Sequence, residues 1–402
     1  MLLRSAADFD AAEDALQEAF VAALSAWPRD GVPAQPAAWL LSVARNRLVS
    51  RLRHEAVVRR KHAELGEAAL ALCRTHADDD ELPDERLRLL FTCCHPALGE
   101  EARVALTLRE MCGLPTAAIA RLFLTSEATV AQRLVRAKRK LRDAGIPFNV
   151  PRAERLEERT DAVLAVVYLL FTEGYSPTVD GPPVRAELCD EAIRLQRQIC
   201  HLMPQNAEAR GLLALMLLHD ARRAARADAV GELLSLAEQD RSRWDRQAIG
   251  EGTRHLEEAL GHGRFGIYQI QAAIAALHAN AARAEDTDWP QIAGLYAELF
   301  RRHPSPSAAL NLAVADGMAH NAASGLAQLE RFVEEGVLAG CGQVAAARAH
   351  LLLSAGHVAR AAAAYQDAIA HARNDREARF FSRRLASLAA TGRASGCLGL
   401  RG

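Results

Sequence analysis

The segment LPTAAIARLFLTSEATVAQRLVRAKRKLR, from Leu114 to Arg142, decides how the first third of this chain folds. Its pattern predicts a short helix, a tight turn and a second helix that becomes strongly basic toward its end. Ile119, Leu122 and Leu134 fall where two crossing helices would bury a shared face. Ser126 stands immediately before the second helix, so we expect its hydroxyl to cap that helix.

The second helix of this segment carries an excess of positive charge. Between Ser126 and Arg142 there are six Lys or Arg residues and a single acid, Glu127. A helix-turn-helix places the start of its second helix against base edges and its flanks against phosphates, so this helix is predicted to bind DNA. A basic, solvated helix in a helical bundle is the alternative. The exposed positions expected to contact DNA are Thr129, Gln132, Arg133, Arg136, Lys138 and Arg139.

The composition of the chain favours helices throughout. It has 402 residues, half of them apolar, which is enough to bury the cores of two or three domains. No run alternates Val, Ile and Thr with polar residues as strands do, so we predict an all-α protein. The net charge of −1 means that basic residues matter only where they cluster. No segment resembles a secretion signal or a membrane span, so we expect a cytoplasmic protein without membrane contact.

An acidic amphipathic helix is predicted near the N-terminus, over residues 8–26. Its acidic face alternates with apolar side chains at steps of three and four. PRDGVPAQP, residues 28–36, then reads as a loop because of its Pro and Gly content. The apolar side chains expected to pack are Phe9, Ala12, Leu16, Phe20 and Leu24.

A second basic helix is predicted from about residue 37 to residue 61. Between Arg45 and Lys61 it carries seven Lys or Arg against Glu55 alone, which suggests a second contact with DNA. A solvated charged face is again the alternative. The apolar stripe of this helix comprises Trp39, Leu40, Val43, Ala44, Leu48 and Leu52.

The acidic stretch ADDDELPDER, residues 77–86, lacks apolar periodicity and is interpreted as a linker between two small helical modules. Beyond about Arg155 the chain becomes Ala- and Leu-rich helix broken by short turns. These changes predict four parts, which are residues 1–62, 63–86, 87–150 and 151–402.

The last part contains signs of a helical repeat. Gly356, Ala361, Tyr365 and Ala368 have the spacing of the second half of a tetratricopeptide repeat, in which small residues let helices approach closely. Such a repeat domain would offer a concave surface to a protein partner. A generic α-helical domain is the alternative.

Together, the two basic modules resemble a bacterial sigma factor of the extracytoplasmic-function type. DFDAAEDALQEAFVAAL (8–24) resembles the part of sigma region 2 that binds the β′ coiled coil of RNA polymerase. PAAWLLSVARNRLVSRLR (36–53) resembles the part that melts and reads the −10 promoter element. Residues 114–142 resemble region 4, which reads the −35 element and binds the β flap.

The resemblance implies a role for several residues of this sequence. Asp14, Gln17, Glu18 and Phe20 would contact core RNA polymerase, since an acidic helix complements a basic coiled coil. The −35 element of promoter DNA would be contacted by the six residues named above. The residues that would face the −10 element, where a flipped single-stranded base needs cations and a pocket, are Arg45, Asn46, Arg47, Arg51 and Arg53.

The remainder resembles the C-terminal extension of one subgroup of these sigma factors, which is tetratricopeptide-like and is thought to take part in control of activity. The stretches that carry this likeness are LLFTEGYSP (169–177), DRSRWDR (240–246), YQIQAAIAALHA (268–279) and DTDWPQIAGLY (286–296). In such factors a further helix normally precedes the acidic one. Here only seven residues precede Asp8, so we expect either a start that is assigned too late or a shortened first helix.

Other classes of protein fit the sequence less well. An operator-binding regulator would use the helix-turn-helix alone and leaves the basic face at 45–61 unexplained. A helical-repeat scaffold with a decayed N-terminal part is a further alternative. No nucleophile-and-base spacing and no phosphate-binding loop is found, so neither an enzyme nor a cofactor is expected. Cys93-Cys94-His95 is a poor chelate because adjacent helical side chains diverge by about 100°, so reduced thiols are expected there rather than a metal.

Overall fold

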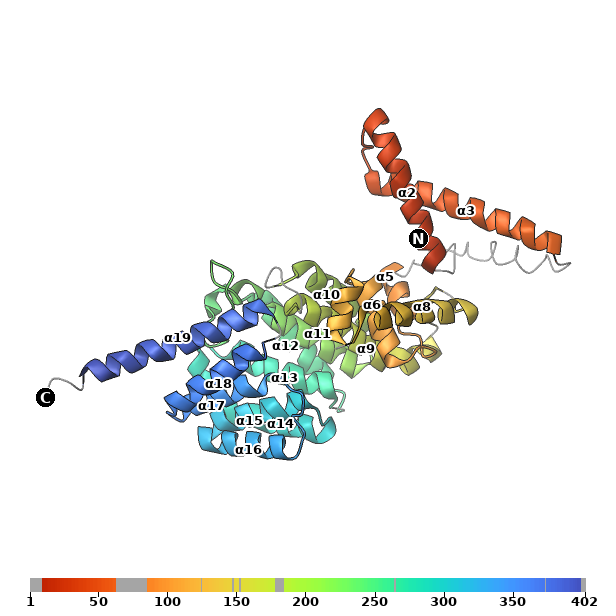
Figure 1. The fold of residues 1–402 in the computed structure, drawn as a ribbon. Helices are drawn as coiled ribbons and strands as arrows, with labels where there is room; N and C mark the ends of the chain where they lie inside the picture. The colour runs from red at the N-terminus through yellow and green to blue at the C-terminus, as the bar shows by residue number, and fades with distance from the viewer. Residues whose placement is uncertain are drawn as a thin grey trace. The chain divides into compact units, whose positions relative to one another are not determined.

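The computed structural model describes residues 9–62, 85–123, 125–146, 148–151, 153–177, 184–263, 265–372 and 374–398. Within these ranges the protein is all-helical, as the sequence predicted, and the extended backbone amounts to one isolated bridge between Ala227 and Leu233. The chain divides into two compact units, Met1–Val166 and Val167–Gly402, and the division lies inside one helix (Figure 1). Each unit is described by itself. The predicted linker at 63–86 falls almost entirely outside the described residues.

The first unit opens with two helices that pack against each other, α2 (Phe9–Asp30) and α3 (Pro36–His62) (Figure 1). Ala15 and Ala19 of α2 meet Ala44 and Leu48 of α3 in one apolar cluster. Side chains this small let the two backbones approach closely. Leu40, Val43, Ala44 and Leu48 of the predicted stripe are therefore confirmed. Trp39 instead contacts the ring of Trp27, and the side chain of Leu52 is not described.

Two expectations about α2 are wrong. The helix continues past Pro28 to Asp30, and its final turn is closed by the amide of Gly31, which donates to the carbonyl oxygen of Trp27 at 3.0 Å. A proline so near a helix end removes one backbone donor without ending the helix. Phe20 and Leu24 do not pack on α3, because the buried face is a stripe of alanines, and they are 48% and 77% exposed.

The rest of the first unit is a bundle formed by α5 (Glu85–Cys93), α6 (Glu100–Glu110), α7 (Thr116–Leu122), α8 (Glu127–Asp143) and the start of α9 (Ala153–Tyr175). Helix α8 packs on both α6 and α7. Ile119 of α7 and Val130 of α8 are fully buried, and Leu134 is nearly so. The two helices predicted from the sequence are therefore confirmed, with α7 ending at Leu122 and α8 beginning at Glu127.

The second unit begins in the last part of α9 and continues through helices that pack mostly on their neighbours in sequence (Figure 1). Three short 3₁₀ turns, η1 (Arg223–Ala225), η2 (Arg241–Arg243) and η3 (Ala284–Asp286), interrupt the series. The α-helices are α10 (Ala186–Leu202), α11 (Ala207–Asp220), α12 (Arg246–Leu260), α13 (Ile267–Asn280), α14 (Trp289–Arg302), α15 (Pro306–Ala319), α16 (Ala322–Glu334), α17 (Val344–Ser354), α18 (Val358–Ala370) and α19 (Asp375–Leu398).

Glycines set the distance between several of these helices. A Cβ atom placed on Gly325 of α16 would lie 2.6 Å from the carbonyl oxygen of Ala313 and 2.7 Å from the Cα atom of Gly317, both on α15. These neighbours are backbone atoms and cannot rotate away. The contact between α15 and α16 therefore requires the absence of a side chain at position 325.

We predict that Gly325→Ala destabilises the second unit by about 1–3 kcal/mol, because the added methyl forces α15 and α16 apart. Gly294→Ala is the matched control: Gly294 lies in α14, and its Cβ would meet nothing within 4 Å. Replacing an unconstrained helical glycine with alanine should raise the free energy of unfolding by about 0.5–1 kcal/mol. Chemical denaturation followed by circular dichroism measures both changes. Equal effects of the two substitutions would contradict the packing described here.

Candidate nucleic-acid interface

Helix α8 has one buried face and one cationic face. Val130, Leu134, Ala137 and Leu141 recur at steps of three and four and are each at most 7% exposed. A helix turns by about 100° per residue, so side chains midway between these positions must point away from the core. The side chains that the structure leaves exposed on that outer face include Thr129, Gln132, Arg136, Arg139 and Lys140.

The start of α8 is fixed by Ser126, as the sequence predicted. The Ser126 hydroxyl accepts a hydrogen bond from the backbone amide of Thr129 at 3.1 Å and lies 2.8 Å from the Thr129 hydroxyl. This cap satisfies one of the amides that a helix leaves unpaired at its start. It also holds Thr129 in the first exposed turn, where a recognition helix meets base edges.

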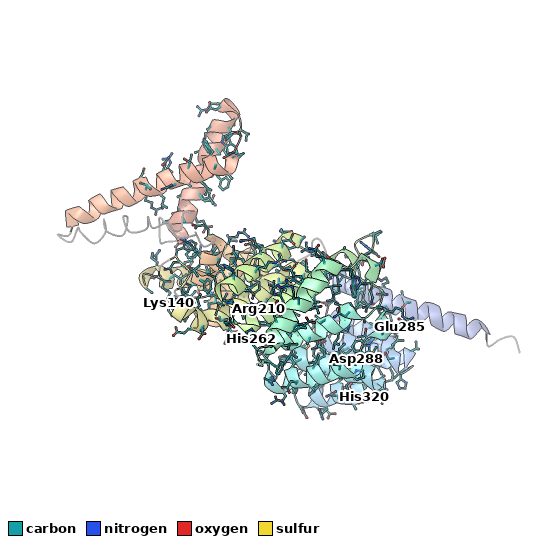
Figure 2. The ribbon with its side chains drawn as sticks, turned by 180° about the vertical axis from the view of Figure 1, so that it is seen from behind. Lys140, Arg210, His262, Glu285, Asp288 and His320 are labelled. Carbon is teal, nitrogen blue, oxygen red and sulfur yellow. The ribbon has the colours of Figure 1, made fainter. Side chains whose placement is uncertain are left out.

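Arg136 and Arg139 extend from the outer face of α8 with weak local partners. Arg136 Nη2 donates to Gln132 Oε1 at 3.0 Å, and Arg139 Nε lies 3.5 Å from Asp143. Lys140 is also exposed and lies beside Arg136 and Arg139 (Figure 2). Exposed contacts of this kind contribute little stability, so Arg136 and Arg139 can exchange their partners for phosphates at small cost.

The expectation that Arg133 is exposed is wrong. Its guanidinium Nη2 lies 2.6 Å from Glu101 Oε2 of α6, and the group sits over the Phe123 ring at 5.1 Å from the centroid. The side chain is 22% exposed. Arg133 thus lies at the edge of the buried stripe, where it ties α8 to the preceding helices.

Lys138 is likewise enclosed rather than exposed. Its Nζ atom lies 3.0 Å from Glu13, 3.3 Å from Glu110 and 3.7 Å from Asp10, and its side chain is 11% exposed. Burial alone would lower the pKa of this ammonium group, but the carboxylates of Glu110 and Glu13 outweigh that effect and raise it. Lys138 therefore stays charged and compensates acids within the first unit.

The predicted −10 residues lie on the outer side of α3. Arg45, Asn46, Arg47 and Arg51 are all exposed. The side chain of Arg53 lies outside the described part of the chain, although its backbone belongs to α3. Four polar or cationic side chains therefore share a solvent-facing surface on a helix whose opposite face is apolar.

Two of these cations pair with the predicted polymerase-binding residues. Arg51 Nη1 lies 3.0 Å from Asp14 Oδ2, and Arg47 Nε lies 3.8 Å from Glu18 Oε2. All four side chains are about half exposed or more. The acids of α2 therefore lie beside the cations of α3. A partner that binds either the acids or the cations competes with these ion pairs.

The exposed face of α2 combines acid with apolar surface. Asp14, Gln17 and Glu18 are exposed, and next to them Phe20 and Val21 present large apolar side chains to solvent at 48% and 64% exposure. Leu24 extends this surface at 77% exposure. Leu24 was predicted to lie on the apolar stripe of this helix, and Val21 was not predicted to be part of this surface. Apolar side chains next to acids on an exposed helix are typical of a protein-binding face.

Chemistry at the cysteine pair is disfavoured by burial. The free thiols of Cys93 and Cys94 are fully buried, and burial raises the pKa of the Cys94 thiol to about 12. Among the described residues, no three His, Cys, Asp or Glu side chains gather as a metal site would require. In the same part of the chain, no helix is both long enough and apolar enough to cross a membrane.

Three segments of the chain match known protein families. Residues 1–57 match the family described as sigma-70 region 2, and residues 88–141 match sigma-70, region 4. Residues 159–260 match a family of unknown function, DUF6596. An uncharacterised protein of Rhizobium meliloti (strain 1021) is 43% identical over 397 residues, which cover 97% of this chain and 92% of that protein. No solved structure matches the chain.

We predict that Lys138→Gln destabilises the first unit by about 1–3 kcal/mol, because it leaves three acids around a neutral group. Lys140→Gln is the matched control, since Lys140 is exposed on the same helix, and it should change stability by less than about 0.5 kcal/mol. Chemical denaturation of both variants measures the difference. If the two substitutions have the same effect, the charge of Lys138 does not stabilise the three acids around it.

Proposed function

The chain belongs to the sigma-70 family, and we propose that it acts as a promoter-specificity subunit of RNA polymerase, of the extracytoplasmic-function type. The observation that carries this proposal is the presence of two separate cationic helical surfaces, on α3 and α8, in the two modules that match sigma regions 2 and 4. A subunit of this kind contributes no catalysis of its own. It directs core polymerase to a promoter by holding two DNA elements at a fixed spacing.

In this proposal α2 binds core polymerase. The acids Asp14 and Glu18 and the apolar Phe20 form its exposed face, with Gln17 between them. A basic coiled coil such as that of β′ would attract the acids, and the apolar side chains would be buried in the interface. Because Asp14 and Glu18 also pair with Arg51 and Arg47, polymerase binding would free these cations for DNA.

Helix α3 would then contact the −10 element. Opening of this element exposes single strands, which are bound by cations along the backbone and by a pocket for a displaced base. Arg45, Arg47 and Arg51 supply the cations, and Arg53 continues the same run in the sequence. Asn46 carries both an amide donor and an acceptor and is the proposed base reader.

Helix α8 would contact the −35 element as duplex DNA, with the β flap as its protein contact. Thr129 and Gln132 lie where base edges would be read, while Arg136 and Arg139 reach the flanking phosphates. Arg133 could contact DNA only after breaking its ion pair with Glu101. Lys138 could do so only after separating from the three acids around it. Their present contacts support a role in orienting α8.

The second unit is proposed to regulate this activity as a tetratricopeptide-like domain that binds a protein partner. Ala361, Tyr365 and Ala368 pack together in one cluster with α17 and α19, as the repeat pattern requires. Gly356 has a φ of 78° in the turn before α18, a conformation that favours glycine. The sequential packing of neighbouring helices also supports a repeat, since each helix pair then contacts mainly the next.

We expect the purified chain to direct core RNA polymerase to initiate at a promoter, and the Asp14→Lys, Glu18→Lys double variant to reduce that output about tenfold or more. Reversing both charges makes α2 repel a basic surface. Run-off transcription and core-binding measurements test this, with Glu335→Lys, an exposed acid of the second unit, as the control. If the double variant binds core polymerase as well as the unmodified chain does, α2 is not the polymerase-binding face.

We expect Arg136→Ala to weaken binding of holoenzyme to duplex −35 DNA and to lower the salt dependence by about one unit of slope, because one phosphate contact is lost. Arg254→Ala, which removes an exposed arginine of α12, serves as the control. Fluorescence anisotropy at several salt concentrations gives both slopes. An unchanged slope for Arg136→Ala would exclude this residue from the interface.

A further inference from the structure

The stretches that mark the second unit in the sequence converge on one place in its structure. Tyr175 ends α9, Arg241 begins the η2 turn, and Trp244 directly follows that turn. His278 and Trp289 lie on α13 and α14. They come from LLFTEGYSP, DRSRWDR, YQIQAAIAALHA and DTDWPQIAGLY respectively. The promoter-recognition proposal uses none of these residues.

Arginines join these aromatic side chains into a continuous cluster. The Arg226 guanidinium lies 3.7 Å from the centroid of the Tyr175 ring, and that ring is 5.5 Å from the imidazole of His219. Arg222 Nη2 is 2.5 Å from His219 Nδ1. Together with Arg241, Trp244, His278 and Trp289, these residues form what we call the arginine–aromatic cluster.

The remaining contacts extend the cluster to α14. Arg222 and Arg241 lie 6.0 Å and 4.4 Å from the centroid of the Trp244 ring. Arg241 Nη1 donates to the carbonyl oxygen of His278 at 2.7 Å, and the His278 ring meets Trp289 at 5.3 Å between centroids. Segments that are more than a hundred residues apart in sequence thus form one cationic and aromatic environment.

The cations of this cluster lack acidic partners. Within the described residues, no carboxylate lies at ion-pair distance from Arg222, Arg226 or Arg241. Arg223, the neighbour of Arg222, instead bonds both Asp190 and Asp220. Arg222 and Arg241 are each only 9% exposed, and a buried charge without a counter-charge is costly.

Nearby acids do not resolve this imbalance. Glu285 and Asp286 interact electrostatically with Arg241, but both are exposed at the connection from α13 to α14, where Figure 2 labels Glu285. Asp286 is hydrogen-bonded to Arg283 instead. The histidines add no negative charge, and burial together with the arginines lowers the pKa of His278 to about 4, so this ring stays neutral at pH 7.

Two polar atoms of the cluster also lack hydrogen bonds. Trp244 is 3% exposed, yet its Nε1–H finds no acceptor among the described residues, and His278 Nδ1 has no partner there either. Buried indole N–H groups normally have an acceptor. Tyr175 and Arg226, at one edge of the cluster, are only partly buried.

The roles of the three arginines differ. Arg241 bonds the carbonyl oxygens of His278 and Ala281, and Arg226 bonds that of Tyr175, so both have a structural function. Among the described residues, the Arg222 guanidinium has one hydrogen bond, to the neutral ring of His219, and so keeps donors for a ligand. A guanidinium fork matches the two oxygens of a carboxylate or phosphate.

We propose that the arginine–aromatic cluster binds a small molecule through a carboxylate or phosphate group, with Arg222 and the Trp244 Nε1–H as the donors. An oxyanion would supply the missing negative charge and the missing acceptor at once. The surrounding rings would hold the rest of a metabolite-sized ligand. The site lies within the second unit, so this inference stands independently of the promoter function.

The test uses the full chain and three probes: inorganic phosphate, pyrophosphate and citrate, each compared with sodium chloride at equal ionic strength. Saturable binding should raise the Tm of the second unit by about 5 °C at about 100 times Kd and should change tryptophan fluorescence. The phosphate and citrate arms distinguish a phosphate-bearing ligand from a carboxylate-bearing one.

Arg222→Gln should abolish the response to every probe while leaving the unliganded Tm unchanged or higher, because it removes an uncompensated charge. Arg197→Gln, an exposed arginine paired with Glu251, should respond as the unmodified chain does. Trp244→Phe should lose the fluorescence change. The proposal is overturned if no probe binds saturably at millimolar concentration, if binding survives Arg222→Gln, or if that substitution lowers the unliganded Tm.

Discussion

The cationic surface of α8 depends on the buried stripe of Val130, Leu134, Ala137 and Leu141. These side chains fix how the helix is rotated against α6 and α7, and that rotation alone decides which cations reach solvent. Gln132, Arg136 and Arg139 lie roughly opposite the stripe and are exposed. Arg133 and Lys138 lie about 70° to either side of its centre, so they meet neighbouring helices. Helical phase therefore determines whether a cation of α8 faces solvent or contacts a neighbouring helix.

Apolar packing also determines where the charged side chains of α2 and α3 lie. In this pair the acids are on one helix and the arginines are on the other. An alanine stripe brings the helices close, and this places the acids of α2 beside the arginines of α3. Exposed ion pairs are weak, so such an arrangement keeps the helix pair soluble while leaving both charged faces available to stronger partners. Binding of one partner then changes the charge that the other partner meets.

Much of the fold could be predicted from the sequence, because helical periodicity and capping residues are local signals. Ser126, Ile119 and the stripe of α3 were placed correctly from spacing alone. The incorrect predictions concern side chains whose exposure depends on tertiary packing rather than on local periodicity. Phe20 and Leu24 have the period of a core face, but the smaller alanines beside them allow closer packing. Arg222 and Trp244 could not be joined from sequence, since the turns that bring them together have no periodicity.

We propose that α3 and α8 act on DNA together only when α2 is bound to polymerase. The most direct measurement is permanganate reactivity of promoter thymines with the chain alone, with core RNA polymerase alone, and with both together. The account predicts reactive thymines in the −10 region only when both are present. Absence of promoter opening in the combined sample, or an identical footprint from the chain without polymerase, would contradict it.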